Sequence, residues 1–290
     1  MNTQELLKKV RLIEIKSRRL SENIFSGEYH SSFKGRGMAF SEVRGYQSGD
    51  DIRSIDWNVS ARKGEPFIKV FEEERELTLM LLIDVSGSGR FGSRQQEKRE
   101  LITEMSATLA FSAIKNNDKV GVIFFSDRVE KFIPPKKGRT HILRIIRELI
   151  EFKPTGRGTR LDSALEYLAG VMKKRAIVFV MSDFDSSTYS KPLKVASRRH
   201  DLTGVFIYDA FEEHLPDLGL VPVVDAESGK TGYLNTSSRT LRRRSDELFW
   251  KRLQTFKQEH LKSGAGSLII RTDESYPKKL HAYFQKRSAR

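Results

Sequence analysis

Short apolar runs recur along the second part of the chain and predict the strands of a sheet. The runs at 77–83, 119–125 and 176–181 are almost unbroken, which is typical of strands buried on both faces of a parallel sheet. Further runs at 203–208 and 267–270 predict two more strands. All of these runs are too short to span a membrane, which takes about 20 apolar residues.

Segments with apolar residues at helical spacing lie between these runs. One begins at Ser93 and Gln96, whose spacing matches a capping box, and ends near residues 116–117. The other predicted helices in this part of the chain span residues 140–152, 161–172, 191–200, 240–262 and 276–287. The alternation of strands and helices indicates an α/β fold.

Two hairpins interrupt this alternation. Residues 129–133 follow the strand at 119–125 after a tight turn and predict an antiparallel hairpin at one edge of the sheet. Residues 219–224 and 231–234 predict a small separate hairpin. The fold class that we expect is therefore α/β, an open, mostly parallel sheet with helices on both faces and one antiparallel edge hairpin.

Residues 1–76 have a different pattern, and we expect an N-terminal helix and a loop-rich lobe there, beside a main domain at 77–290. Residues 3–20 carry apolar side chains at helical spacing among many lysines and arginines. This basic amphipathic helix either docks on the main domain, which we favour, or lies on a membrane surface. Residues 21–76 are rich in Gly, Asp, Arg and aromatic residues, with a strand expected at 66–71.

Charged residues surround Trp57 in the predicted lobe. They are close enough in sequence to form an ion-pair network, which either fixes the lobe to the main domain or binds a partner; we favour the first. The members of this network are Asp50, Asp51, Arg53, Asp56 and Arg62. A partner-binding surface here would consist of Asp50, Asp51, Arg53, Asp56 and Trp57.

The composition of the chain limits the cellular compartment and the kinds of binding partner that we expect. The chain has 290 residues and no cysteine, which excludes disulfides, thiolate metal sites and cysteine nucleophiles. It shows neither a signal-peptide pattern nor a membrane-spanning run, so we expect a soluble, cytoplasmic protein. The net charge of +14 favours acidic partners, nucleic acid or an anionic membrane surface.

Oxygen-bearing side chains follow the first predicted strand. Asp84, Ser86 and Ser88 form an Asp-x-Ser-x-Ser pattern at the carboxyl end of that strand, where open α/β sheets bind their ligands. One carboxylate and two hydroxyls suit a hard divalent cation much better than zinc. The pattern predicts a metal site, with Mg²⁺ as the expected ion and Mn²⁺ or Ca²⁺ as alternatives.

Two more oxygen donors follow later elements. Asp183 comes directly after the strand that ends near Ser182, much as Asp84 ends the first strand. Thr159 follows a glycine-rich loop at the start of a predicted helix, where its hydroxyl either caps the helix or binds the same cation. Because the carboxyl ends of parallel strands meet at one edge of a sheet, we expect these donors to join the first three.

The sequence lacks the motifs of several enzyme classes. Its six histidines are scattered, with no His-Glu-x-x-His pair, so a zinc hydrolase is not expected. It has neither a P-loop motif nor the glycine fingerprint of dinucleotide-binding folds. Ser60 and Lys63 match Ser-x-x-Lys, but the accompanying motifs of acyl transfer are missing. We therefore expect no catalytic residues and no enzyme activity.

The candidate site resembles the metal-ion-dependent adhesion site of von Willebrand factor type A domains. The resemblance rests on Asp84-x-Ser86-x-Ser88, Thr159 in Gly-Thr-x-Leu and Asp183 in Ser-Asp-Phe, in that order. It implies that Ser86, Ser88 and Thr159 bind a divalent cation through their hydroxyls. Asp84 and Asp183 would then act directly or through water.

A second resemblance covers nearly the whole chain. Arg36-Gly-Met, Glu42-Val-Arg and Gly49-Asp-Asp-x-Arg-Ser-Ile-Asp-Trp-Asn are similar to segments of the bacterial domain of unknown function 58 family. The resemblance implies a MoxR-type AAA+ ATPase and other von Willebrand type A proteins as partners, and it implies no catalysed reaction.

Three functions remain open from the sequence. We favour a metal-dependent protein-binding module that takes an acidic side chain of a partner and serves as an adaptor for an AAA+ ATPase in the assembly or maturation of other proteins. The second is nucleic-acid or anionic-surface binding through basic residues such as Arg239, Arg242, Arg243 and Arg244. The third is a metal-dependent hydrolase, although no general base stands beside the serines in the sequence.

Overall fold

The described residues form two compact units. The computed structural model describes residues 3–21, 39–72, 77–90, 92, 96–156, 158–186, 189–225 and 229–288. The main unit consists of Met1–Ser32 and Thr78–Arg290, and the small unit consists of Phe33–Leu77. The small unit ends close to the boundary expected at residue 76, but the N-terminal helix belongs to the main unit.

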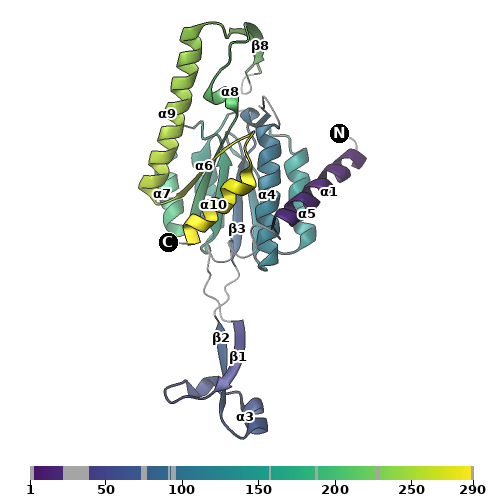
Figure 1. Cartoon of the computed structure of the whole chain (residues 1–290), viewed down its shortest axis with the longest axis vertical. Helices are drawn as coiled ribbons and strands as arrows, with labels where there is room; N and C mark the ends of the chain where they lie inside the picture. The colour runs from purple at the N-terminus through teal and green to yellow at the C-terminus, as the bar shows by residue number, and fades with distance from the viewer. Residues whose placement is uncertain are drawn as a thin grey trace. The chain divides into compact units, whose positions relative to one another are not determined.

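A six-stranded sheet forms the centre of the main unit (Figure 1). Its strands are β3 (Thr78–Asp84), β4 (Lys119–Phe125), β5 (Val129–Lys136), β6 (Ile177–Ser182), β7 (Asp201–Tyr208) and β10 (Gly266–Arg271). Their order is β10-β7-β6-β3-β4-β5, and only the edge strand β5 runs antiparallel to its neighbour. The predicted open, mostly parallel sheet with one antiparallel edge hairpin is confirmed.

Helices cover both faces of this sheet. They are α4 (Lys98–Lys115), α5 (Arg139–Glu151), α6 (Leu161–Val171), α7 (Ser190–Arg199), α9 (Arg239–Ser263) and α10 (Tyr276–Ser288), and the short helix α8 (Ala210–Glu213) follows β7. The helices α6, α7 and α9 share one core with Val178 and Val180 of β6. The opposite face of β6 carries Phe179, which packs edge-on against Phe284 of α10, and Met181, which accepts a hydrogen bond from a serine of α4. Successive strand residues point to opposite faces, so the two helical layers are distinct.

The first predicted strand, β3, is buried along almost its whole length. Residues 79–83 are each at most 1% exposed because β3 has a strand on either side and helices on both faces. Burying one large apolar side chain contributes about 1.5–3 kcal/mol. This double coverage explains why the run is almost unbroken rather than alternating.

The N-terminal helix α1 (Thr3–Leu20) docks on the main unit, as we favoured. It packs against α4 and α5 (Figure 1) and buries Leu6, Val10 and Ile13. On its polar side, Lys9 pairs with Glu100 of α4 at 2.7 Å. These contacts are the reason that α1 belongs to the main unit and not to the lobe that follows it. Among the helices of the described residues, none is long and apolar enough to cross a membrane.

The small unit is an antiparallel pair of strands with two short helical segments between them. The strands β1 (Ala39–Gly45) and β2 (Phe67–Glu72) pair with each other, and the 3₁₀ turn η2 (Ile52–Ser54) and α3 (Trp57–Lys63) lie in the connection. The strand β2 was expected. The helix α3 was not, because a helix of 7 residues is too short to show a hydrophobic period.

Three carboxylates of the ion-pair network expected around Trp57 make local contacts. Asp50 pairs with Arg44 through two hydrogen bonds of 2.8 Å. Asp51 accepts a hydrogen bond from the amide two residues later and caps η2, and Asp56 caps α3 in the same way. Short carboxylate side chains favour such bonds to nearby free amides over ion pairs with more distant cations. Trp57 is 69% exposed.

Two smaller predictions have different outcomes. The strands β8 (Leu220–Val224) and β9 (Thr231–Asn235) form the predicted small hairpin. The capping box predicted before α4 involves Ser93, which lies outside the described residues. The residue that precedes α4 is Glu97, and its side chain makes no capping hydrogen bond.

Candidate metal centre

Two neighbouring strands at the centre of the sheet carry the predicted site. The strands β3 and β6 lie side by side in parallel, and the chain leaves them in opposite directions, from β3 toward β4 and from β6 toward β7. Open α/β sheets bind ligands at such a switch point, outside the carboxyl ends of the strands. Asp84 is the last residue of β3, and Asp183 follows the last residue of β6. The two predicted acids therefore flank the switch point.

The Asp84 carboxylate is buried, and both of its oxygens accept hydrogen bonds. Ser182 Oγ donates to Oδ2 at 2.6 Å, and Ser86 N donates to Oδ1 at 2.9 Å. Burial of Asp84, and then the nearby charge of Asp183, raise the pKa of Asp84 to about 6 in spite of these bonds. Ser182, which was not among the predicted site residues, thus fixes the orientation of one that was.

A short turn brings the two predicted serines together. The 3₁₀ turn η3 (Gly87–Arg90) begins directly after Ser86, and Ser86 Oγ and Ser88 Oγ lie 3.1 Å apart in a hydrogen bond. Ser86 is buried and Ser88 is half-buried. Each hydroxyl has two lone pairs, so one stays available on each oxygen for a small cation.

Asp183 is ionised and is held by a buried lysine. Lys98 Nζ donates to Asp183 Oδ2 at 2.9 Å, and the two side chains are 2% and 3% exposed. Burial of Asp183 opposes its charge, but Lys98 and then Arg252 outweigh burial and lower the pKa of Asp183 to about 2. The next residue, Phe184, has a positive φ of 53°. Such a backbone is uncommon for a bulky residue and indicates a strained turn at the site.

Lys98 also connects the site to an acid far away in the chain. Its Nζ donates to Glu212 Oε1 at 2.9 Å. Glu212 lies in α8, where its second carboxylate oxygen accepts a hydrogen bond from Asp209 N and completes a capping box. Burial works against the Lys98 ammonium, but the charges of Asp183 and Glu212 outweigh burial and raise the pKa of Lys98.

Lys98 was not among the predicted site residues, but its position in the sequence contains one indication that it is buried. Lys98 lies three residues before Leu101 and four before Ile102, so it occupies the apolar face of α4 and not the solvent face. Long charged side chains are almost never fully buried unless they are paired. A lysine on an apolar helix face therefore indicates a buried acid nearby, but it does not identify which acid.

A small cavity lies among these groups. Its volume is about 10 Å³, which is about the space that one water molecule or one small ion occupies. The residues that line it are Asp84, Ser88, Gly89, Lys98, Ile102, Ser182, Asp183 and Ile207. Ser86 adjoins the cavity through its bond to Ser88. The structure thus brings together Asp84, Ser86, Ser88 and Asp183.

Thr159 does not line this cavity, and it does not cap α6 either. The residue that precedes α6 is Arg160, without a side-chain cap. Arg160 N donates to Ser126 O at 2.7 Å, and Ser126 follows β4, the strand next to β3. The loop before Thr159 is held by Glu130, which accepts hydrogen bonds from both the hydroxyl and the amide of Thr155. The loop that carries Thr159 therefore lies at the same edge of the sheet, beside the end of β4.

The donor set fits a hard cation. Two carboxylates and two hydroxyls present oxygen atoms only, which suits Mg²⁺, Mn²⁺ or Ca²⁺. Nowhere in the described part of the chain, this site included, is a group of three or more His, Cys, Asp or Glu side chains arranged to hold a metal ion, so a cation here would depend on the two serine hydroxyls as well as the two carboxylates. One feature works against a cation, because the Lys98 ammonium already neutralises Asp183.

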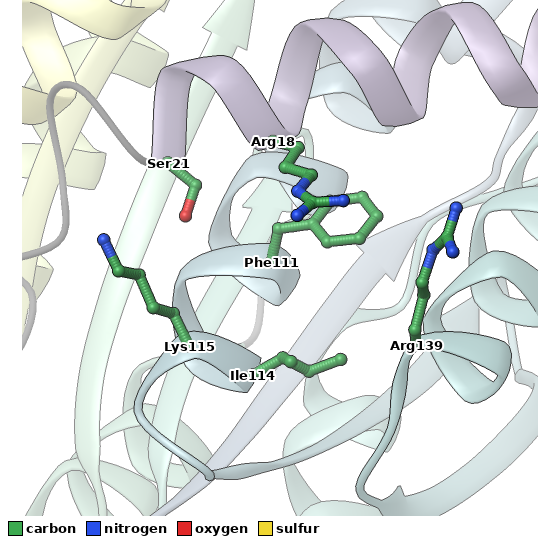
Figure 2. Close-up of a pocket in the computed structure, with 6 residues that line it drawn as sticks. All are labelled: Arg18, Ser21, Phe111, Ile114, Lys115 and Arg139. Carbon is green, nitrogen blue, oxygen red and sulfur yellow. The ribbon is translucent and has the colours of Figure 1, made fainter.

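Figure 2 shows a larger cavity of about 460 Å³ in the main unit, where the ends of α1 and α4 meet the start of α5. Phe111 and Ile114 form its apolar part, and Lys115, Arg18 and Arg139 are its cationic residues. Arg139 already pairs with Glu14, and Arg18 also has a partner. Its size is typical of ligand pockets, but two of its three cations are engaged within the protein, so the candidate chemistry lies at the sheet edge.

Several solved structures are similar to this chain at low sequence identity. An aerotolerance-related membrane protein from Bacteroides fragilis has 17% identity and a TM-score of 0.48, covering 73% of this chain and 98% of its own. BatB from Bacteroides thetaiotaomicron has 14% identity and a TM-score of 0.47, covering 74% and 100%. A mussel byssus protein with a zinc-occupied metal-ion-dependent adhesion site has 13% identity and a TM-score of 0.38, covering 73% and 70%. All these TM-scores are below 0.5, so these proteins' ligands do not transfer to this chain.

Sequence relatives and a family model give more direct evidence about the family of this chain than the solved structures do. An uncharacterized protein of Mycobacterium tuberculosis, Rv1480, is 29% identical over 223 residues, which are 76% of this chain and 70% of the relative. The uncharacterized protein YeaD of Bacillus subtilis is 29% identical over 122 residues, which are 42% of this chain and 27% of the relative. The family model described as "Protein of unknown function DUF58" matches residues 42–252. The chain therefore belongs to the DUF58 family, which confirms the resemblance drawn from its sequence.

Proposed function

We propose that this chain is a protein-binding module that takes an acidic side chain of its partner through a divalent cation at the sheet edge. The observation that carries the proposal is the convergence of Asp84, Ser88 and Asp183 on an ion-sized cavity at the switch point. Mg²⁺ is the ion that we propose, with Mn²⁺ and Ca²⁺ as alternatives. When bound, the ion supplies a positive centre with positions open to an oxygen of the partner.

The surroundings of the donors support a role in binding an acid. The serine hydroxyls add no negative charge. Asp84 accepts hydrogen bonds from Ser182 and Ser86, and the Asp183 charge is neutralised by Lys98. A cation held by such a set keeps most of its attraction for a further carboxylate. Thr159, at the same edge, is an additional candidate ligand.

The proposed partner is a MoxR-type AAA+ ATPase, with this chain as an adaptor in the assembly or maturation of other proteins. The support is membership of the DUF58 family, together with the partners that the sequence resemblance implies. Other von Willebrand type A proteins are further candidates. We also propose that the module catalyses no reaction, because the sequence lacks the enzyme motifs considered above and no general base stands beside the serines in the sequence.

The basic face is less suited to nucleic acid or an anionic surface than its charge suggests. At the start of α9, Arg242 pairs with Asp217 at 3.0 Å and Arg243 pairs with Glu247 at 2.8 Å. Arginines engaged in this way contribute less to phosphate binding, which depends on the number of phosphate charges neutralised. We therefore place this function behind protein binding.

Metal binding tests the proposal directly. Mg²⁺ at 100 times its Kd should stabilise the native chain by about 2.7 kcal/mol, measured as a rise in Tm that EDTA reverses. The double substitution Ser86→Ala and Ser88→Ala should abolish this rise. The matched control is Ser197→Ala, since Ser197 is a helix serine that donates to Leu193 O away from the site. An equal Mg²⁺ response in the double variant would remove the metal from these residues.

Partner capture tests the second step of the proposal. The chain should retain the ATPase in Mg²⁺ and release it in EDTA, and Thr159→Ala should retain it weakly. If the ATPase stays bound in EDTA and to the serine double variant, its contact lies elsewhere. The exposed Trp57 of the small unit is then the first place to test.

A further inference from the structure

The buried Lys98 ammonium lies in the wall of the candidate metal cavity. The cavity of about 10 Å³ is lined by Lys98 together with Asp84, Ser88 and Asp183. Lys98 is 2% exposed, and its Nζ lies 2.9 Å from Asp183 Oδ2 and 2.9 Å from Glu212 Oε1. Asp183 Oδ2 is one of the carboxylate oxygens that could bind a cation, and it already accepts a hydrogen bond from the Lys98 ammonium.

A buried ammonium of this kind is stable only because it is paired. Moving an unpaired charge out of water costs several kcal/mol, and the two carboxylates offset this cost. A divalent cation in the cavity would lie close to Lys98, in surroundings that screen like charges poorly. Ion and ammonium therefore compete for Asp183.

Glu212 offers the ammonium an alternative position. Because Lys98 already contacts both acids, it can give up Asp183 and keep Glu212 without crossing the protein. Glu212 in turn caps α8 through Asp209 N, and Arg252 of α9 lies 3.9 Å from Glu212 and 3.4 Å from Asp185. A change in the pairing of Lys98 would therefore alter the contacts that Glu212 makes in α8 and with Arg252 of α9.

We infer that Lys98 is the resident counter-ion of Asp183, competes with the divalent cation for this carboxylate, and shifts to Glu212 when the cation binds. In this arrangement the protein stays folded without metal because Lys98 neutralises Asp183. The same contact weakens the binding of the metal and couples its arrival to α8. The inference rests on the proposed metal-dependent function and assigns Lys98 as the residue that sets the affinity.

The substitution Lys98→Met tests this competition, because methionine is unbranched, similar in length and uncharged. Without metal the variant leaves Asp183 and Glu212 buried without a cation, so its Tm should fall. Its Mg²⁺ affinity, measured by titration calorimetry, should rise at least tenfold, and Mg²⁺ should restore the lost Tm. Lys98→Arg keeps the charge and should show no such gain. Lys9→Met is the matched control, since Lys9 also pairs with a glutamate, at 2.7 Å, but away from the site.

The substitution Glu212→Gln tests the same idea in the opposite direction. Glutamine keeps an oxygen for Asp209 N but removes the charge that attracts Lys98 away from Asp183. Its Mg²⁺ affinity should therefore fall several-fold, and this variant decides the question if Lys98→Met does not fold.

The outcomes separate this inference from the proposed function. If the wild type binds Mg²⁺ and Lys98→Met binds it no more tightly, the inference is wrong and the proposed function stands. If only Lys98→Met binds Mg²⁺, the inference holds and the proposed function fails for the natural chain. If neither binds Mg²⁺, both are overturned.

Discussion

The main unit and the small unit both carry clustered carboxylates, but they use them in different ways. At the sheet edge, Asp84 and Asp183 are 7% and 5% exposed, and their partners include Lys98, which is 85 residues away from Asp183 in the chain. In the small unit, Asp50 pairs with Arg44 only six residues away, and Asp56 bonds to amides of the next helical turn. A buried charge must be matched by the fold, whereas a charge close to solvent is largely stabilised by water. Similar acidic patterns therefore carry very different energies.

The largest expected difference between the two regions concerns Asp183. The substitution Asp183→Asn should lower the free energy of unfolding by about 4 kcal/mol, because it leaves Lys98 buried with one carboxylate fewer. Denaturant unfolding in EDTA measures this loss. In the small unit, Asp50→Asn should leave the denaturation midpoint nearly unchanged. A loss of less than about 1 kcal/mol at Asp183 would show that the buried pair does not stabilise the main unit.

Acid should destabilise the main unit through His260 of α9, which is 1% exposed. Burial lowers the pKa of His260 to about 4, below the value of about 6.5 in the unfolded chain. Folding thus favours the neutral form of His260, and the protonation of this residue destabilises the folded state. The stability of the main unit is therefore unaffected by His260 above pH 6.5 and falls as the pH decreases toward 4. At pH 5 the loss should be about 2 kcal/mol.

The variant His260→Gln isolates this effect. The raised pKa of Asp84, about 6, makes an opposite contribution, because the folded state then binds the proton more readily as the pH falls below 6. The difference in unfolding free energy between wild type and His260→Gln, measured at pH 7.5 and pH 5, removes the Asp84 contribution. A difference that does not change with pH would mean that His260 is not buried in its neutral form.

A smaller effect is expected from the local contacts of the small unit. The substitution Asp56→Ala removes the N-cap of α3 and should destabilise this helix by about 1 kcal/mol. Hydrogen exchange of the amides in α3 should become faster, while the amides of β3 in the main unit keep their protection. Equal changes in both units would contradict the local character of these contacts.

The smallest effect on stability is expected at Trp57. Because its side chain is 69% exposed, Trp57→Ser should change the free energy of unfolding by less than about 0.5 kcal/mol. If the small unit binds a partner through Trp57, partner capture will fall although stability does not. Loss of both together would indicate that Trp57 is a structural residue.

Some features of this protein followed from local sequence alone. The unbroken apolar runs predicted β3, β4 and β6 because a strand covered on both faces needs apolar side chains at every position. The ends of these strands then located Asp84, Ser86, Ser88 and Asp183, since parallel strands bring their carboxyl ends to one edge. The cap formed by Asp56 also depends on neighbouring residues only. Several charged residues lie close together in this part of the sequence, however, and this spacing predicted an ion-pair network instead of caps.

Other features depended on which elements lie next to each other in the fold. Lys98 and Glu212 are 114 residues apart, and only the strand order, with β3 beside β6 and β6 beside β7, brings α4 and α8 to the same edge. Thr159 has the residue type of a ligand, but it does not line the cavity, and its neighbour Arg160 bonds to Ser126 at the end of β4. The sequence by itself determined the strands, the helices and the oxygen donors, because these depend on neighbouring residues. The tertiary structure alone decided which charges meet, because the pairing of buried groups depends on distances that spacing along the chain does not set.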